Sequence, residues 1–236
     1  MKVLVLGHKG MLGHMVAMYL RSKDVDVITT NIRWPKSPFT LSNVDCDYVI
    51  NCIGAIPQRT DDFDINWQLP IWLDLHAPCK VIHPGTDCEM DSDRYGVSKN
   101  IAANYIRNLS KQTKSIKTSI IGPEMFGNAS LMEWFLDQEG EVFGYTKALW
   151  NGNTTLEWSK QCLHLMNNWN SNYNEIVIAS TPISKFNLLK AMKVVFNKDI
   201  DIKEKELGSN KCLEGTIYTG TIQEQLEEIK EWYYEQ

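Results

Sequence analysis

The 236-residue sequence lacks three features that would each indicate a particular class of protein. No stretch approaches the roughly 18 consecutive apolar residues of a membrane-spanning helix, so we expect no membrane partner. Acidic residues outnumber basic ones by 29 to 24, whereas a nucleic-acid surface needs clustered lysine and arginine, so we expect no nucleic-acid partner. No C-x-x-C pair occurs, which argues against a zinc cage, and we expect no metal site. The cysteines are widely scattered and are expected to be reduced thiols in the cytoplasm: Cys46, Cys52, Cys79, Cys88, Cys162 and Cys212.

What the sequence does contain, in its first half, is an alternation of apolar strand-like runs and helix-like periodicities. The opening MKVLVLG is too short an apolar run for a signal segment and is expected to be a buried strand. Strands are also predicted at 25–29, 48–54 and 80–86, and helices at 11–20, at 65–75 and from Tyr95 to Leu109. This alternation predicts an α/β protein with a Rossmann-type, doubly wound parallel sheet.

After Ile121 the pattern changes, because Gly122-Pro123 interrupts it and tryptophan, phenylalanine and glycine become frequent. Helices are expected over 156–169 and 186–196, a strand over 175–180, and a last helix from Ile222, which we expect to pack on the core. We therefore expect one domain over 1–236, with a dinucleotide-binding part over 1–121. Residues 122–236 would form a mixed part with a small substrate-binding region.

Three glycines follow the first strand at the spacing G-x-x-G-x-x-G: Gly7, Gly10 and Gly13. Such glycines allow a tight turn and let the backbone approach a pyrophosphate, while the N-terminus of the next helix offers its unpaired N–H groups. Because strand, turn and helix are all in order, the segment predicts a dinucleotide-binding site.

The end of the second strand carries Thr29, Thr30 and Asn31 where an acidic residue would bind the hydroxyls of an adenosine ribose. Arg33 follows closely, and Lys9 lies inside the glycine turn, so two cations are available for a 2′-phosphate. We therefore expect NADP(H) to be preferred, with NAD(H) as the alternative.

A tyrosine and a lysine four residues apart, Tyr95 and Lys99, begin the predicted third helix and share one face of it. A nearby ammonium favours phenolate, so we expect Lys99 to lower the pKa of Tyr95 toward the range of a working acid or base. The hydroxyl of Thr86, which ends the HPGT segment, would hydrogen-bond the reacting carbonyl. The three residues predict proton transfer to a sugar oxygen.

Together with Asn51-Cys52-Ile53-Gly54, Asn66 and Thr86-Asp87, these motifs resemble the extended short-chain dehydrogenase/reductase superfamily, and within it the dTDP-4-dehydrorhamnose reductases. The resemblance covers about the first 160 residues. It implies that Thr86, Tyr95 and Lys99 are catalytic, with Tyr95 as the proton donor. The cofactor-binding residues that we expect are Gly7, Lys9, Gly10, Met11, Leu12, Gly13, Asn31, Arg33, Asn51, Cys52, Ile53, Gly54, Tyr95, Lys99 and Ile121.

For the sugar nucleotide, the resemblance points to SLMEWFL at 130–136 and to the segment 144–160. The substrate-binding residues that we expect are Ala55, Thr86, Asp87, Met125, Trp150, Asn151 and Thr155. The reaction implied is NADP(H)-dependent reduction of a dTDP- or UDP-linked 4-keto-6-deoxyhexose.

Two other functions stay open at this stage. A nucleotide-sugar epimerase or dehydratase uses the same tyrosine, lysine and hydroxyl but keeps its NAD bound. A non-catalytic subunit of this fold would bind the dinucleotide and regulate another enzyme. The sequence also leaves open whether the working form is a homodimer.

Overall fold

The computed structural model describes residues 1–31, 33–35, 41, 44–169 and 172–235. The chain forms two compact units, of which the first comprises Met1–Lys117 with Ser159–Ile176 and the second Thr118–Trp158 with Val177–Gln236. The segment Ser159–Ile176, which the sequence analysis included in the mixed part over 122–236, lies in the first unit. No helix among the described residues is long and apolar enough to cross a membrane.

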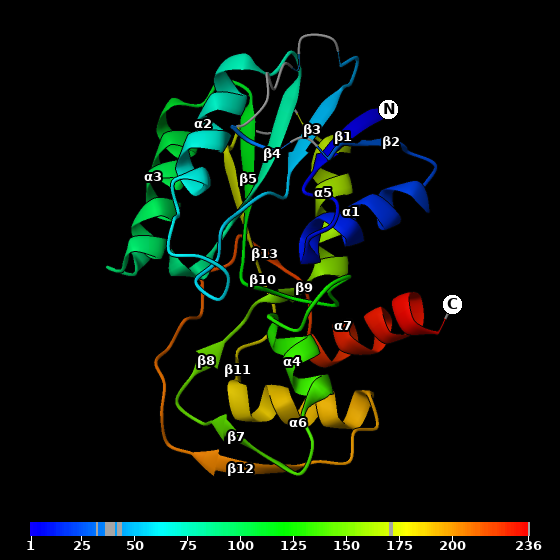
Figure 1. Ribbon diagram of the computed structural model, residues 1–236, viewed down its shortest axis with the longest axis vertical. Coiled ribbons are helices and arrows are strands. Elements are labelled where there is room, and N and C mark those ends of the chain that lie inside the picture. The colour runs from blue at the N-terminus through cyan, green and yellow to red at the C-terminus, as the bar shows by residue number, and fades with distance from the viewer. Residues whose placement is uncertain (32, 36–40, 42–43, 170–171, 236) are drawn as a thin grey trace. The chain divides into compact units, whose positions relative to one another are not determined.

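Five parallel strands form the sheet of the first unit, in the order β5-β4-β3-β1-β2 (Figure 1). All pairings are parallel, with Leu4 opposite Val49 and Ile50 opposite Ile82. The strands are β1 (Lys2–Leu6), β2 (Asp26–Thr29), β3 (Tyr48–Asn51), β4 (Lys80–Gly85) and β5 (Thr113–Lys117). The predicted α/β fold with a doubly wound parallel sheet is confirmed.

Helices connect these strands and cover both faces of the sheet, with α1 (Met11–Arg21) on one side and α2 (Ile65–His76) and α3 (Arg94–Leu109) on the other (Figure 1). A short 3₁₀ helix, Asp87–Met90, lies between β4 and α3, and α5 (Thr155–Asn167) belongs largely to the first unit. The order of connection reverses at β1, since β2 lies on one side of it and β3 on the other. Ligands of such sheets bind where the order reverses, outside the carboxyl ends of the strands.

The core of the first unit is aliphatic. Val3, Val5 and Leu6 of β1 and Val49 and Ile50 of β3 are each fully buried, as expected for strands covered on both faces.

The second unit is built from short elements. Its parallel pair β7 (Glu141–Tyr145) and β12 (Asp201–Lys205) runs in register from Glu141 opposite Asp201 to Tyr145 opposite Lys205. The strand β10 (Glu175–Ala179) begins in the first unit and pairs in the second with β13. The remaining elements are β6 (Ile120–Ile121), α4 (Leu131–Asp137), β8 (Leu149–Trp150), β9 (Asn153–Thr154), β11 (Ile183–Ser184), α6 (Lys185–Val195), β13 (Ile217–Tyr218), α7 (Ile222–Ile229) and a π-helical turn, Lys230–Tyr234.

The last helix packs on its own unit, as predicted. Ile222, Leu226 and Ile229 of α7 are buried, and Tyr234 beyond it donates a hydrogen bond to Glu133 at 2.9 Å.

One buried carboxylate, that of Asp74 near the end of α2, organises the connection between α3 and β5. It accepts hydrogen bonds from the Ser110 hydroxyl at 2.6 Å, from the Thr113 backbone and hydroxyl at 3.0 and 2.8 Å, and from the Tyr105 hydroxyl at 2.9 Å. Burial raises the pKa of the Asp74 carboxyl, but these hydrogen bonds outweigh it and hold the pKa below its usual value.

We expect Asp74→Ala to lower the free energy of unfolding by about 2 to 3 kcal/mol, because it leaves several buried donors without an acceptor. Urea unfolding at pH 7 measures the loss. The depressed pKa means that the contribution of Asp74 is present above the pKa of the unfolded chain and is lost as the pH falls through the lower, folded value. The difference between wild type and variant should therefore shrink on acidification. An equal difference at pH 7 and pH 3 would contradict this account.

Candidate functional site

The glycine turn between β1 and α1 approaches its neighbours so closely that two of its glycines leave no room for a side chain. Gly7 has a φ of +74°, and a Cβ there would lie 2.8 Å from the carbonyl oxygen of Cys52. A Cβ on Gly13 would lie 2.2 Å from the carbonyl oxygen of Gly7. Gly10, which caps α1, would tolerate a Cβ at 3.4 Å from the same oxygen.

A cavity of about 260 Å³ opens beside this turn in the first unit. It contains both cations that the sequence assigned to a 2′-phosphate, Lys9 and Arg33, and Arg33 is exposed. The lining residues are Gly7, His8, Lys9, Gly10, Thr30, Asn31, Arg33, Trp34, Ile53 and Ile65. The structure thus brings six of the predicted cofactor residues together around one cavity. Of the others, Leu12 is buried under the turn and Met11 is half-buried.

Four lining residues of this cavity were not among the predicted site residues: His8, Thr30, Trp34 and Ile65. Burial and the charge of Lys9 lower the pKa of His8, which favours the neutral ring. Trp34 packs against Trp72 of α2, with ring centroids 4.8 Å apart and the ring planes tilted by 55°. The sequence offered one signal for Trp34 as a lining residue, namely its position directly after Arg33. A tryptophan in an irregular segment has no helical or strand periodicity that would predict its role.

The segment after β3 is held by two buried asparagines. Asn51 accepts a hydrogen bond from the Ile53 backbone at 3.1 Å and contacts His83 at 3.2 Å. Asn66 of α2 bonds both the N–H and the carbonyl of Ala55, at 2.8 and 3.0 Å. Because both asparagines use their amides on this backbone, Gly54 and Ala55 are fixed beside the start of α3.

The 3₁₀ helix after β4 fixes the hydroxyl of Thr86. Thr86 caps this helix, and its hydroxyl accepts a hydrogen bond from the Cys88 backbone at 3.2 Å and donates one to Asp87 at 3.2 Å. The Glu89 carboxylate in turn accepts a hydrogen bond from the Thr86 backbone at 3.4 Å. Thr86 therefore serves as a helix cap, and its hydroxyl also hydrogen-bonds Tyr95.

Tyr95 and Lys99 lie on one face of α3, as predicted, with the Lys99 ammonium 6.0 Å from the centre of the Tyr95 ring. The ring of Phe63 packs edge-on against that of Tyr95, with centroids 5.6 Å apart. Ser98 of the same turn donates to the Tyr95 carbonyl at 2.6 Å and accepts from Asn66 at 3.1 Å. A Cβ on Gly54 would lie 3.3 Å from the amide oxygen of Asn66 and 3.6 Å from the Lys99 ammonium, so the Gly54 backbone lies close to both side chains.

The prediction that the pKa of Tyr95 is lowered is wrong. Burial raises the pKa of Tyr95 to about 12, and the hydrogen bond with the Thr86 hydroxyl offsets this in part. Burial also lowers the pKa of Lys99, to about 8. At neutral pH Tyr95 therefore holds its proton and Lys99 is mostly charged, which is the state that a proton donor and its cationic neighbour require.

The predicted residues Ile121, Met125, Trp150, Asn151 and Thr155 belong to the second unit, and their roles stay predictions. Both ends of the Asn151 amide are bonded to the backbone of Leu213, at 2.8 and 2.9 Å. Trp150, Thr155 and Ile121 are buried, whereas Met125 is exposed.

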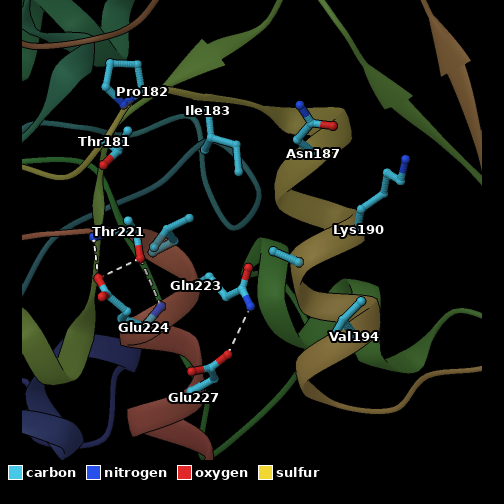
Figure 2. A pocket seen from close by; sticks show the side chains of 12 residues that line it. Thr181, Pro182, Ile183, Asn187, Lys190, Val194, Thr221, Gln223, Glu224 and Glu227 are labelled. Carbon is cyan, nitrogen blue, oxygen red and sulfur yellow. Dashed lines mark hydrogen bonds between the residues drawn. The ribbon is translucent and has the colours of Figure 1, made fainter.

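A second cavity, of about 490 Å³, lies within the second unit between α6 and α7 (Figure 2). None of the predicted site residues lines it. Two of its polar groups bond one another, since Gln223 donates to Glu227 at 3.0 Å, and Glu224 is bonded to the Thr221 backbone at 2.9 Å. We therefore place the candidate site in the first unit, at the glycine turn and the Thr86–Tyr95–Lys99 cluster.

We expect Gly13→Ala to abolish dinucleotide binding and to destabilise the fold, because the added methyl group collides with the Gly7 carbonyl. Gly10→Ala is the matched control, since its methyl group meets only an ordinary contact. NADPH binding measured by fluorescence, together with thermal melting, tests both variants. If Gly13→Ala bound NADPH as well as Gly10→Ala does, the close approach would not constrain the site.

No protein-family model and no curated protein matches the chain, whereas solved structures do. The dTDP-4-dehydrorhamnose reductase of Bacillus anthracis, solved with NADP, is 13% identical, with a TM-score of 0.78 over 98% of this chain and 99% of that one. The corresponding reductase of Yersinia enterocolitica is 15% identical, with a TM-score of 0.72 over 97% and 98%. The UDP-glucose 4-epimerase of Thermotoga maritima, solved with UDP-glucose, is 15% identical, with a TM-score of 0.70 over 100% and 99%. The chain therefore has the Rossmann-type fold of the dTDP-4-dehydrorhamnose reductases and the related nucleotide-sugar epimerases and dehydratases.

Proposed function

We propose that the chain is an NADP(H)-dependent reductase of a nucleotide-linked 4-keto-6-deoxyhexose, of the dTDP- or UDP-4-dehydrorhamnose type. The observation that carries the proposal is the convergence of Thr86, Tyr95 and Lys99 within the same unit as the glycine turn. The fold alone would not suffice, because Rossmann-type folds serve many functions.

The first unit fits a dinucleotide. The turn leaves no room for side chains at Gly7 and Gly13, and the adjoining cavity of about 260 Å³ presents Lys9 and Arg33. We assign the pyrophosphate to the N-terminus of α1 and the 2′-phosphate to the two cations. When bound, NADPH supplies the hydride for reduction of a carbonyl carbon.

The residues of the chain supply the proton and the position of the substrate. Tyr95, with its pKa of about 12, holds the proton that passes to the sugar oxygen. The Thr86 hydroxyl, which donates to Asp87 in the chain without substrate, would turn to donate its proton to the same oxygen, and the Lys99 ammonium favours the tyrosinate left behind. Asn66 fixes Ala55, and the adjoining Gly54 brings backbone without a side chain close to Lys99.

An epimerase or dehydratase with tightly bound NAD is the second candidate. It is supported by the likeness to the dTDP-glucose 4,6-dehydratase of Bacillus anthracis, which was solved with NAD and is 13% identical, with a TM-score of 0.69 over 100% of this chain and 97% of that one. The absence of an acidic residue beside Asn31 favours the NADP(H) enzyme over this candidate.

We expect the purified chain to oxidise NADPH in the presence of dTDP- or UDP-4-keto-6-deoxyhexose, and Tyr95→Phe to lower kcat by at least about 100-fold, because the phenyl ring has no proton to donate. Nicotinamide absorbance follows the reaction. NADPH binding by the variant should stay within about twofold of the wild type, which excludes unfolding as the cause.

Two other outcomes would redirect the assignment. Conversion of a sugar nucleotide without net NADPH oxidation, with NAD co-purifying, would indicate an epimerase or dehydratase. Dinucleotide binding without turnover of any sugar nucleotide would indicate a regulatory binder.

We expect Arg33→Ala to weaken NADPH binding about tenfold or more while leaving NADH binding within about twofold, since a charge-assisted hydrogen bond to phosphate contributes roughly 1.5 to 3 kcal/mol. Titration of both dinucleotides by fluorescence gives the two dissociation constants, and NADH is the internal control. An unchanged ratio would remove Arg33 from the 2′-phosphate site.

A further inference from the structure

Glu89 is a buried acidic residue that the proposed reaction does not use directly. It ends the first turn of the 3₁₀ helix after β4, and its side chain is 2% exposed. Its two carboxylate oxygens have different partners. One accepts the hydrogen bond from the Thr86 backbone at 3.4 Å, and the other accepts from Lys117 at 2.6 Å and from Arg107 at 3.1 Å.

The bond to Thr86 is reciprocal, because the Thr86 hydroxyl also accepts a hydrogen bond from the Glu89 backbone in a capping box. A capping box satisfies two N–H groups at once and so fixes the side chains of both partners. Here one partner is the residue to which we assign the hydrogen bond to the substrate carbonyl. The position of the Thr86 hydroxyl therefore depends on the carboxylate of Glu89.

Two cations, Lys117 and Arg107, bind the second carboxylate oxygen of Glu89. Arg107 also bonds Glu175, at 3.3 Å, so that it joins two carboxylates. Gly85 makes room for Lys117, since a Cβ on Gly85 would lie 2.8 Å from the Cβ of Lys117. The absence of a side chain directly before Thr86 thus allows Lys117 to reach Glu89.

Glu89 also shares a small enclosed cavity with Lys99. The cavity measures about 10 Å³, close to the smallest space that holds one water molecule. Its other lining residues include His83 and Ser115. A carboxylate and an ammonium that face one enclosed space interact more strongly than the same pair in bulk water.

Among the described residues that face Lys99, Glu89 is the one that carries a negative charge. Burial lowers the pKa of His83 to about 3, so its ring is neutral. Burial raises the pKa of Cys88 to about 12, so its thiol is neutral as well, and Tyr95 keeps its proton. The charge of Glu89 opposes the effect of burial on the pKa of Lys99.

We propose that Glu89 is a positioning residue of the active site, which fixes the Thr86 hydroxyl through the capping box and keeps Lys99 charged across the shared cavity. The expected effect of Glu89 on turnover rests on the proposed function. Its expected effect on the pKa of Lys99 does not. Glu89 does not touch the substrate. It links Thr86 and Lys99, two groups that lie on different elements.

The test compares Glu89→Gln with Glu175→Gln. Glu175 is the matched control, because it binds Arg107 in the same network but does not contact Thr86 and does not itself line the cavity, which it meets only through Ser115 at 3.2 Å. Lysine labelled with ¹³C is titrated by NMR in each protein, and the Lys99 signal is identified by its loss in Lys99→Arg. We expect the pKa of Lys99 to fall by about one unit in Glu89→Gln, the lower end of the range for a nearby opposite charge, and to stay within about 0.2 unit of the wild-type value in Glu175→Gln.

Turnover provides the second measurement. With the pKa of Lys99 near 8 in the wild type, a fall of one unit reduces its charged fraction at pH 8 about fivefold and leaves it almost unchanged at pH 6. The kcat of Glu89→Gln relative to wild type should therefore fall about fivefold between pH 6 and pH 8. A loss of activity that is equal at both pH values would show a structural role only and would overturn the proposal.

The two hypotheses fail in different ways. Absence of turnover in the wild type would reject the proposed reductase, while the NMR titration would still decide the role of Glu89. Equal Lys99 titrations in the two glutamine variants would overturn the proposal even if the wild type were an active reductase.

Should Glu89→Gln not fold, Lys117→Met takes its place, since removing this cation leaves Glu89 less screened. The pKa of Lys99 should then rise, and an unchanged value would overturn the proposal.

Discussion

The close approach of the Gly7–Gly13 turn to itself and to the end of β3 is the constraint on which the candidate site depends. A side chain at Gly13 would occupy the position of the Gly7 carbonyl, and one at Gly7 would meet Cys52. Helix α1 can begin directly beside β1 and β3 only because both positions lack a Cβ. The cavity of about 260 Å³ that Gly7 and Gly10 line lies beside this turn.

The sequence predicted those parts of the fold that strong periodicity marks. The apolar runs of β1 and β4 and the amphipathic stretches of α3 and α6 stand within a residue or two of their predicted bounds, whereas β3 ends at Asn51, before its predicted end at 54. The strand β5 was missed, because Thr113-Lys-Ser-Ile-Lys117 looks polar. Three of its polar side chains are nevertheless buried, and each has a partner within the first unit: Thr113 bonds Asp74, Lys114 bonds the Tyr173 carbonyl at 2.5 Å and Ser115 bonds Glu175 at 3.2 Å. Such pairings join distant segments and leave no local signal.

The same limit applies to the candidate site. Motif spacing brought Thr86, Tyr95 and Lys99 together correctly, and it found the glycines and cations of the cavity. It did not find Glu89 or Trp34, whose roles depend on which distant residues they contact. It also misjudged the pKa of Tyr95, because the spacing shows that a lysine lies nearby but not that burial outweighs its effect.

The chain leaves the first unit after Lys117, returns at Ser159 and leaves again after Ile176. The returning segment supplies the Met166 carbonyl that accepts the Tyr48 hydroxyl at 2.8 Å and the Glu175 carboxylate that binds Arg107. A fragment that stops at Lys117 would lack both partners, so a single cut there does not yield the complete first unit. Synthesis on the ribosome meets the same restriction, since the first unit cannot be completed until the intervening segment of the second unit has also been made. The order in which the chain emerges therefore ties the maturation of one unit to the presence of the other.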